Sequence, residues 1–332
     1  MAVTLKDVAE RAGVSRSAVS RTFTEGASVS AKTRDKVRRA AEELGYSPNA
    51  LASSLTTGRT KMIGLVSNNF HNPIFLQVFD LFTRGLQNRG LRPLLVNLTD
   101  EVEPENSLRM LRQYSVDGVI VASSTLPTSF AEAFAAAGVP VVHSFGRHRP
   151  DPVVDILGID NIEAGRIAAR TLISRGYTRL AFLGGPEGAT STQDRATGFL
   201  EVIAANPGVS VSTSFASNYS FDAGRAEMGR LLSAPLAEAY FCGDDVLSIG
   251  ALSALQGAGL RVPEDVGIIG LNDMEMARWD NINLTTIHNP IGEIIEASVA
   301  LVADLVQSEG HVPQARLFDC SVVERGTLRA MR

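Results

Sequence analysis

The chain has 332 residues, 45% of them hydrophobic and 20% charged, a composition typical of a globular protein with ample material for a core. A single core seldom grows beyond about 250–300 residues, so we expect at least two compact units. No apolar run approaches the roughly 20 residues that a membrane-spanning helix needs, and the N-terminal residues lack the layout of a secretory signal. The two cysteines, Cys242 and Cys320, show no CxxC spacing. We therefore predict a cytoplasmic protein with no disulfide framework, metal or cofactor.

The net charge of −5 is divided unevenly along the chain. Residues 1–61 contain eleven Lys or Arg and six Asp or Glu, which gives +5, whereas the remaining residues contain 20 basic and 30 acidic residues, which gives −10. A basic head on an acidic body favours a head that alone meets a polyanion such as nucleic acid. From charge alone, a solvated basic face remains an equal alternative.

The sequence of the basic head predicts three short helices. Thr4 and Asp7 have the spacing of a capping box, and Ser15 and Ser30 are placed to cap a second helix, about Arg16 to Phe23, and a third helix that ends at Gly45. The apolar residues recur at helical spacing on one side of each helix, and they are Leu5, Val8, Ala9, Ala12, Val19, Phe23, Val37, Ala40, Ala41 and Leu44. This order of helix, tight glycine turn, helix and supporting helix is typical of a helix-turn-helix domain. A structural three-helix cap is the alternative that the pattern leaves open.

The same residues resemble the head of LacI/GalR transcription regulators. The resemblance is carried by Leu5-Lys-Asp-Val-Ala-Glu-Arg-Ala-Gly-Val-Ser-Arg-Ser-Ala-Val-Ser-Arg21, by Val29-Ser…Thr33-Arg, and by Leu44-Gly-Tyr-Ser-Pro-Asn-Ala-Leu-Ala52. It implies a DNA-binding domain over residues 1–46 whose Arg16, Ser17 and Arg21 face base edges. The candidate DNA-binding residues are Thr4, Ser15, Arg16, Ser17, Ser20, Arg21, Asn49, Ala52 and Leu55.

Residues 47–60 are predicted to join head and body. A helix as short as Asn49–Leu55 is marginal by itself and should order only against a partner surface. The resemblance implies a hinge helix that pairs with its dimer mate in the DNA minor groove, with Leu55 wedged between base pairs. Without the resemblance, a linker with one exposed leucine is the simpler interpretation.

From residue 62 onward, apolar strands alternate with helical patterns, which indicates parallel sheets covered on both faces. The predicted strands are 62–67, 94–98, 118–123, 140–145, 180–184, 209–215, 239–243 and 266–271. The predicted helices are 73–90, 104–114, 128–137, 161–175, 194–205, 222–232 and 246–257. The pattern predicts an α/β body of two Rossmann-like lobes, and in open α/β sheets ligands bind beyond the carboxyl ends of the strands.

The body also resembles the effector domain of the same family, which is similar to periplasmic sugar-binding proteins. The shared segments include Ile63-Gly-Leu-Val66, Asp117-Gly-Val-Ile120, Gly158-Ile-Asp-Asn161, Ala181-Phe-Leu-Gly-Gly185 and Leu284-Thr-Thr-Ile287. The resemblance implies an effector-binding and dimerisation domain over residues 61–332. Lobe 1 would comprise about 61–158 plus 291–319, and lobe 2 about 159–288 plus 320–332.

Polar and aromatic residues gather at the predicted strand ends, as a polyhydroxylated ligand requires, because each buried hydroxyl needs a partner and ring faces pack on aromatics. The candidate effector-binding residues are Ile74, Phe75, Ser123, Ser144, Asp160, Arg195, Tyr219, Asp244, Asn272 and Asn289. The family resemblance implies contact with the effector for seven of them, which are Ile74, Phe75, Arg195, Tyr219, Asp244, Asn272 and Asn289. Asn272 departs from the family, in which this position often carries Asp, and an amide both donates and accepts whereas a carboxylate only accepts. Individually, such loop residues are also common as caps and turn formers.

Enzyme motifs are missing from the sequence. It contains no GxGxxG, GxxxxGK[ST], GxSxG or HExxH pattern, and each of the five histidines is interpreted as a loop or surface residue. We predict a homodimeric, sequence-specific DNA-binding regulator, most simply a repressor, that reads a pseudo-palindromic operator and responds to a sugar or sugar derivative. A nucleobase or another small metabolite is the second candidate effector. The alternative is a cytosolic small-ligand-binding protein whose basic head docks a protein partner.

Overall fold

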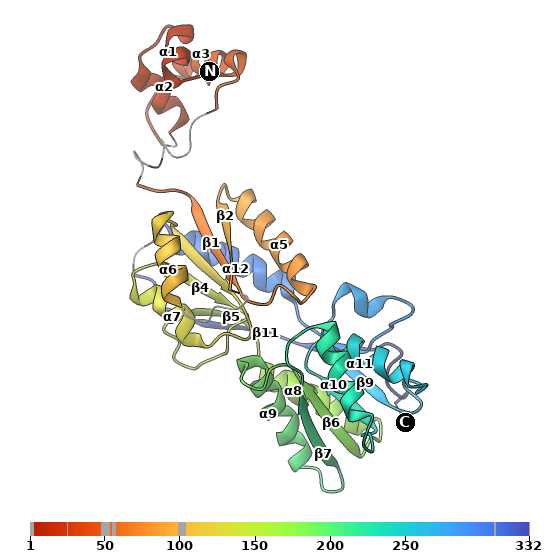
Figure 1. Cartoon of the computed structure of the whole chain (residues 1–332). Coiled ribbons are helices and arrows are strands. Elements are labelled where there is room, and N and C mark those ends of the chain that lie inside the picture. The colour runs from red at the N-terminus through yellow and green to blue at the C-terminus, as the bar shows by residue number, and fades with distance from the viewer. Residues whose placement is uncertain are drawn as a thin grey trace. The chain divides into compact units, whose positions relative to one another are not determined.

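The computed structural model describes residues 3–24, 26–47, 54, 58–98, 104–308 and 310–331. The chain forms two compact units that divide between Lys61 and Met62, and Figure 1 shows the elements of each unit. We refer to them as the head and the body.

The head consists of α1 (Leu5–Ala12), α2 (Arg16–Phe23) and α3 (Ala31–Leu44). The capping box is present, because the Thr4 side chain accepts from the Asp7 amide and the Asp7 carboxylate accepts from the Thr4 amide. Ser15 and Ser30 cap the next two helices, and Gly13 and Gly45 end α1 and α3 in the left-handed conformation. All ten apolar residues predicted to face inward belong to one cluster that holds the three helices together.

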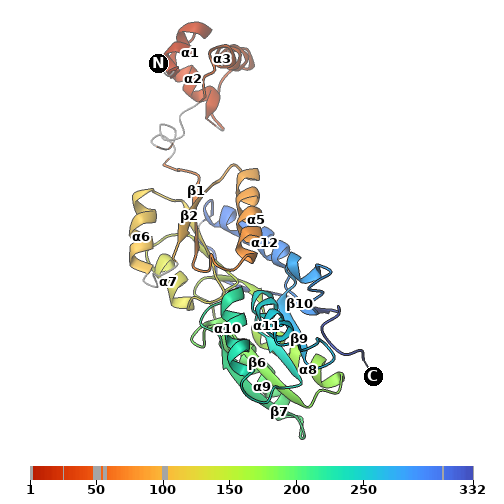
Figure 2. The same cartoon turned by 45° about the vertical axis from the view of Figure 1, so that its right-hand side comes forward.

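The first lobe of the body is built on a six-stranded parallel sheet. Its strand order is β11-β5-β4-β3-β1-β2. The strands are β1 (Met62–Ser67), β2 (Arg92–Asn97), β3 (Gly118–Ala122), β4 (Val141–Ser144), β5 (Asp155–Ile159) and β11 (Ala315–Phe318). Helices α5 (Ile74–Asn88) and α12 (Ile291–Leu305) pack together on one face, and α6 (Pro104–Gln113) and α7 (Thr128–Ala136) cover the other (Figure 2).

The second lobe has a sheet of the same size. Its order is β12-β10-β9-β8-β6-β7, and only the β10–β12 pair is antiparallel. The strands are β6 (Arg179–Gly184), β7 (Ser210–Phe215), β8 (Ala239–Cys242), β9 (Gly267–Asn272), β10 (Thr286–His288) and β12 (Ser321–Val323). Helices α8 (Asn161–Ser174) and α9 (Thr190–Ala204) form one packed pair, and α10 (Phe221–Leu231) and α11 (Asp245–Gly257) form another. A short 3₁₀ turn, η1 (Glu275–Arg278), follows β9.

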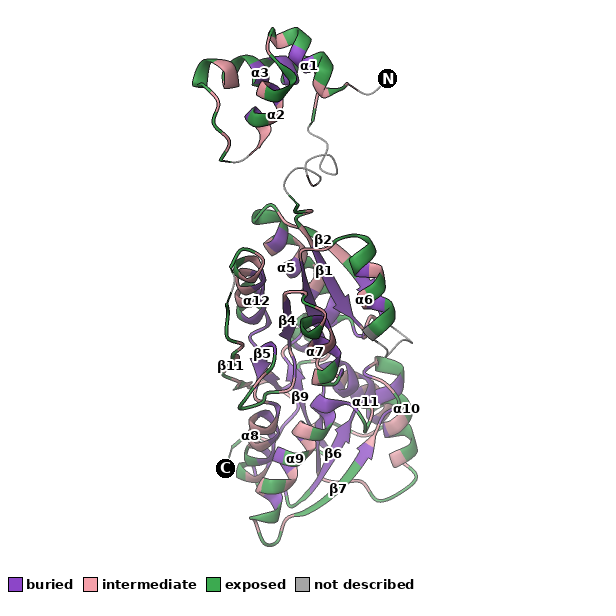
Figure 3. Ribbon diagram, turned by 90° about the vertical axis from the view of Figure 1, so that its left-hand side faces the viewer, coloured by how far each residue is buried: buried purple, intermediate pink, exposed green. Residues whose placement is uncertain are grey.

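The buried residues lie mainly on the strands and on the helix faces toward them, as the purple ribbon in Figure 3 shows. In β6, Phe182 packs toward the α8–α9 side and its neighbour Leu183 toward the α10–α11 side, which is the alternation expected of a strand covered on both faces.

The chain passes between the lobes three times. The passages lie between β5 and α8, between β10 and α12, and between β11 and β12. Each lobe is therefore assembled from segments that are distant in sequence, and the space between the lobes is bordered by three connections.

Glycines let the helices of each pair approach closely. A Cβ at Gly198 would lie 1.8 Å from the Ile162 carbonyl oxygen, and one at Gly165 would lie 2.2 Å from the Arg195 carbonyl oxygen. Because α8 carries Asn161 and α9 carries Arg195, this close approach sets the separation of two candidate site residues.

The structure corrects several sequence-based predictions. Helix α9 begins at Thr190, four residues before the predicted start, because tertiary contacts hold its Ser- and Thr-rich first turn, which by composition is typical of a loop. Strands β5, β10, β11 and β12 were not predicted, since each is short or interrupted by polar residues. Helix α12 was not predicted either, because the predicted elements end at residue 271. His143 is not a surface residue: it is fully buried in β4, where Nε2 lies 3.0 Å from the Ser123 carbonyl oxygen, and burial lowers its pKa to about 4.

No helix in the described part of the chain is long and apolar enough to cross a membrane.

Candidate ligand cleft and DNA-contact surface

Helix α2 presents an exposed polar surface along one side. Arg16, Ser17 and Arg21 are exposed, Ser20 is half-buried, and Val19 on the opposite side is fully buried in the head's core. Two further candidates, Thr4 and Ser15, act as helix caps and also remain exposed. The spacing of residues 16, 17, 20 and 21 places them on one side of the helix.

The two arginines of this surface are free for an external partner. Within the described residues neither Arg16 nor Arg21 forms an ion pair, whereas Arg11 on α1 is paired with Glu43 at 2.5 Å. A guanidinium without an internal partner can hold the O6 and N7 acceptors of guanine with two hydrogen bonds. The remaining candidates of this group, Asn49, Ala52 and Leu55, lie outside the described residues.

A cleft of about 560 Å³, including solvent at its mouth, lies between the two lobes of the body. This size suits a small organic ligand. Its lining residues come from both lobes, and they are Asn69, Asn72, Ile74, Phe75, Val78, Ser124, Phe145, Ile159, Asn161, Arg195, Tyr219, Asp244, Asn272, Asn289 and Ile291.

The two lobes line the cleft differently. All the aliphatic side chains and both phenylalanines come from lobe 1, from α5, the ends of β4 and β5 and the start of α12. The arginine, the carboxylate and the tyrosine come from lobe 2, together with three of the five amides. A ligand in the cleft therefore meets an apolar wall on one side and charged and hydrogen-bonding groups on the other.

A chain of hydrogen bonds runs along the lobe 2 wall. Asp244 caps α11 by accepting from the Val246 amide, and its Oδ2 accepts from Asn272 Nδ2 at 2.8 Å. Asn272 Oδ1 in turn accepts from Asn289 Nδ2 at 3.0 Å. From the other lobe, Asn72 Nδ2 donates to the same Asp244 Oδ2 at 3.0 Å, so the carboxylate joins the two walls of the cleft.

The direction of this chain follows from the carboxylate. An ionised Asp244 only accepts, so Asn272 must present its NH₂ group to it, and Asn289 must then present its own NH₂ group to Asn272. The Asn289 Oδ1 atom is left buried and without a partner among the described residues. A buried acceptor of this kind requires a donor, so the cleft calls for a ligand with a hydroxyl or N–H group at this position.

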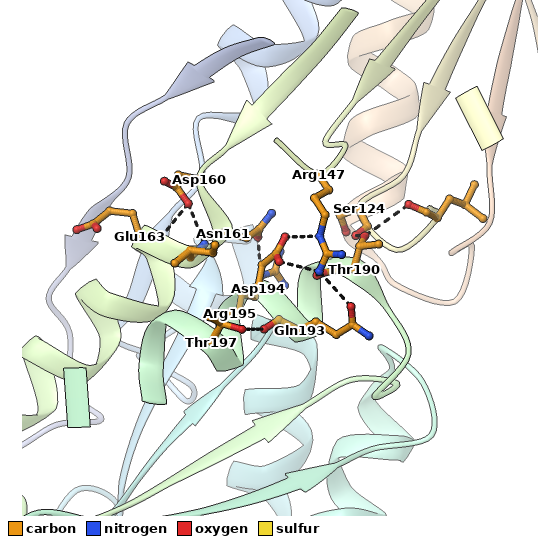
Figure 4. A network of polar contacts seen from close by, with 12 residues as sticks. Ser124, Arg147, Asp160, Asn161, Glu163, Thr190, Gln193, Asp194, Arg195 and Thr197 are labelled. Carbon is orange, nitrogen blue, oxygen red and sulfur yellow. Dashed lines mark hydrogen bonds and ion pairs between the residues drawn. The ribbon is translucent and has the colours of Figure 1, made fainter. Parts of the chain in front are cut away.

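Among the described residues that line the cleft, Arg195 is the one cation, and it is buried with 4% of its surface exposed. Its Nε donates to Asn161 Oδ1 at 2.8 Å and its Nη1 to the Gly243 carbonyl at 2.5 Å, and Figure 4 shows it beside Asn161. These bonds hold the plane of the guanidinium and leave Nη2 without a protein partner in the described part of the chain. Arg195 can therefore donate to ligand oxygens in a fixed direction.

Tyr219 lies against a backbone that has room for it only because residue 185 is glycine. A Cβ at Gly185 would lie 2.4 Å from the Tyr219 ring. The Tyr219 hydroxyl is 2.6 Å from Thr192 Oγ1, so its polar end is satisfied by α9 while the residue lines the cleft.

The carboxyl groups beside the cleft are strongly affected by burial. Burial raises the pKa of Asp244 to about 6 and that of Asp245 to about 7, although hydrogen bonds from Val246 and from Thr286 oppose the change. Asp245 faces away from the ligand wall and accepts from Thr286 Oγ1 at 2.5 Å and from the Met274 amide at 2.8 Å. It therefore braces β9 and β10 rather than contacting a ligand.

Seven of the ten candidate effector-binding residues line the cleft, and the other three lie next to it. Ser123 is buried and bonds to Asn68 and to the Thr125 and Leu126 amides. The Ser144 hydroxyl donates to Ser298 at 2.7 Å. Asp160 caps α8.

In each of these three cases the following residue, Ser124, Phe145 or Asn161, is the one that lines the cleft. Asn69, Asn72, Val78, Ile159 and Ile291 also line the cleft and were not among the candidates. Among the described residues, no group of three or more His, Cys, Asp or Glu is arranged to hold a metal ion.

Comparisons with known proteins cover both units. Residues 4–49 match the family model described as "Bacterial regulatory proteins, lacI family", and residues 169–328 match the model described as "Periplasmic binding protein-like domain". The chain is 33% identical over 328 residues to the HTH-type transcriptional repressor PurR of Escherichia coli O139:H28 (strain E24377A / ETEC), which covers 97% of this chain and 96% of the relative. The corresponding repressor of Yersinia pestis (strain Pestoides F) is equally similar.

Two solved structures extend the comparison. The lac repressor dimer bound to operator and the anti-inducer ONPF matches with a TM-score of 0.89 at 27% identity, over 99% of this chain and all of that chain. The transcriptional regulator CelR in complex with cellobiose matches with a TM-score of 0.72 at 30% identity, over 98% of this chain and 99% of that chain.

Proposed function

The chain belongs to the LacI family of bacterial regulatory proteins, and from this premise we propose that it is a cytoplasmic, homodimeric repressor whose affinity for a pseudo-palindromic operator is set by a small molecule in the cleft. The observation that carries the proposal is the α2 surface of the head, where Arg16 and Arg21 are exposed and form no ion pair with any residue that the structure describes. Two such surfaces in a two-fold dimer fit two half-sites of opposite orientation.

The DNA-binding part of the proposal is tested by selecting binding sites from random duplexes with the full-length protein. We expect an enriched palindrome, and affinity for it that falls linearly on a log–log plot against salt, since the protein releases counterions from the phosphates. Arg16→Ala should lower the preference for one base pair per half-site by about 1–3 kcal/mol.

Arg11→Ala is the matched control, because Arg11 is an exposed arginine of the same head that is already paired with Glu43. It should leave sequence preference unchanged. If no duplex is enriched and binding does not depend on salt, the DNA-binding role fails, and the basic head is then the docking site of a protein partner.

For the ligand, the cleft supports a neutral, polyhydroxylated molecule. The cleft lining holds one cation, Arg195, and one carboxylate, Asp244, so a ligand need not bring a charge. Arg195 Nη2 requires an acceptor and Asn289 Oδ1 requires a donor, and a sugar hydroxyl supplies both. The apolar lobe 1 wall fits the face of a sugar ring. The CelR relative was solved with cellobiose.

The ligand is identified by calorimetric titration of the full-length protein with cellobiose, with monosaccharides and with free nucleobases. We expect a sugar to bind and to change operator affinity. Arg195→Ala should abolish that response and keep operator binding without ligand. Arg166→Ala, at a half-buried arginine of α8 that is paired with Glu163 and Glu201, should keep both. Binding of a nucleobase but of no sugar would contradict the ligand class while leaving the regulator role intact.

A further inference from the structure

The lobes are also joined by a cluster of contacts away from the three chain passages. Arg147, in the connection from β4 to β5 of lobe 1, makes a two-pronged ion pair with Asp194 on α9 of lobe 2. The distances are 2.9 Å from Nε to Oδ2 and 2.7 Å from Nη2 to Oδ1. Figure 4 shows this pair apart from Asp160, where β5 leads into α8.

The same guanidinium holds the first turn of α9 at two further points. Its Nη2 donates to the Thr190 carbonyl at 3.1 Å and to Gln193 Oε1 at 3.0 Å. These bonds fix the position of the first turn of α9, but they do not cap the helix, because a guanidinium only donates and Ala189 at the N-cap position has no side-chain acceptor.

A second group of contacts lies beside the ion pair. The Ser124 carbonyl of lobe 1 accepts from Thr190 Oγ1 at 3.0 Å and from the Ser191 amide at 3.1 Å. Because Ser124 also lines the cleft, these bonds close the cleft on this side. We call Arg147, Asp194, Ser124 and Thr190 the clamp.

The clamp is connected to the candidate ligand site through α9. Asp194 and Arg195 are consecutive residues of this helix, one directed to Arg147 and the other to Asn161 and Gly243. Any movement of the first turn of α9 relative to lobe 1 therefore moves Arg195 relative to the apolar wall of the cleft.

We propose that the clamp holds the cleft closed through its Arg147–Asp194 ion pair, and that Arg147 is a positioning residue that sets the distance of Arg195 from lobe 1. The pair is strong enough for this role because it is bidentate and charge-assisted. It is also able to open, because the Arg147 side chain remains 33% exposed and that of Asp194 15% exposed, so water and salt compete for the pair.

The Ser191 amide reports directly on closure. As a first-turn amide it has no acceptor within its own helix, and its acceptor is a carbonyl of the other lobe. In full-length protein without ligand, hydrogen exchange resolved to single residues should show that Arg147→Gln accelerates exchange at Ser191 about five- to tenfold, as expected for loss of a charge-assisted bond. Asp194→Asn should do the same.

The control is Arg149→Gln, in the same connection, which breaks an ion pair with Glu132 that lies wholly within lobe 1. It should leave Ser191 unchanged. Core amides of β6 should exchange at the same rate in all variants, since a general loss of stability would accelerate these as well. Raising KCl from 50 mM to 1 M should accelerate Ser191 exchange in the unaltered protein and have no effect in Arg147→Gln.

The proposal is overturned if Ser191 exchanges at the unaltered rate in both Arg147→Gln and Asp194→Asn, or if β6 amides accelerate equally. One consequence rests on the proposed function: stopped-flow binding of the sugar found by titration should show faster association and faster dissociation in Arg147→Gln. If no sugar binds, the ligand assignment fails, while the exchange experiment still decides whether the clamp exists.

Discussion

At the scale of single residues, the hydrogen bonds directed from Asn289 through Asn272 to Asp244 determine which hydrogen-bonding group a ligand must present to the cleft. The sequence predicted Asp244 and Asn272 at strand ends, and the family resemblance added Asn289, but neither predicted the order in which the three residues bond. It also selected Ser144 where the next residue, Phe145, lines the cleft. Phe145 has a φ of 66° and Asn272 a φ of 118°. Backbone turns with positive φ determine which of two neighbouring residues faces a site, and an apolar sequence pattern does not reveal them.

Asn272→Asp should destabilise the protein. The new carboxylate would lie beside Asp244, which only accepts, so two negative charges would share one buried site. We expect the free energy of unfolding in urea at pH 8 to fall by about 2–4 kcal/mol, and by less at pH 5 where the pair can hold a proton. Asn88→Asp, at an exposed asparagine, is the control. Equal stability at pH 8 would show that the Asn272–Asp244 bond does not form.

Asp245 should make the protein less stable as the pH rises. Its pKa is raised to about 7 by burial, so between about pH 4 and pH 7 the folded state keeps a proton that the unfolded chain has lost. Unfolding then releases a proton, and the free energy of unfolding falls with rising pH over this interval. His143 acts in the opposite direction, since its lowered pKa makes the folded state bind fewer protons. Denaturation measured at several pH values from pH 5 to pH 8 should therefore show that the free energy of unfolding falls less steeply with pH for Asp245→Asn than for the unaltered protein. An unchanged pH profile would remove Asp245 as the cause.

At the scale of elements, most long helices and buried strands up to residue 272 were predicted within a few residues, because their apolar spacing determines both their type and their buried face, but the 15-residue helix α12 was not predicted. The start of α9 was not, since Thr190 and Ser191 are held by Ser124 of the other lobe and not by local propensity. The four missed strands are three to five residues long, and each depends on a neighbour already in the sheet. Tertiary contacts decide elements of this length.

Gly198→Ala should separate α8 from α9. The new methyl group would overlap the Ile162 carbonyl, so the helices must move apart and the Arg195–Asn161 bond must lengthen. We expect a loss of about 3 kcal/mol in the free energy of unfolding and a weaker ligand response. Gly229→Ala is the matched control: this exposed glycine of α10 has nothing within 4 Å of an added methyl group, and the change should stabilise the protein by about 0.5–1 kcal/mol. Equal effects of the two changes would contradict close packing at Gly198.

At the scale of the whole molecule, the head and the body have separate cores. The cluster around Val8, Val19 and Val37 contains only head residues. Calorimetry of the full-length protein without DNA should therefore show two transitions. Val37→Ala removes two methyl groups from a fully buried site and should lower only the head transition, by about 2–3 kcal/mol. Phe241→Ala should lower only the body transition. A single transition that both changes shift would show that the two units unfold together.

The three passages between the lobes have a consequence for the order in which the protein is made. Lobe 1 receives α12 and β11 only from residues 291–318, after every helix of lobe 2 has left the ribosome. Until then the edge of β5 and the apolar surface of α5 remain uncovered, while more than a hundred further residues are synthesised. Such surfaces attract chaperones and other nascent chains. We expect the synthesis of residues 291–318, which supply α12 and β11, to be the step at which lobe 1 becomes protected from aggregation.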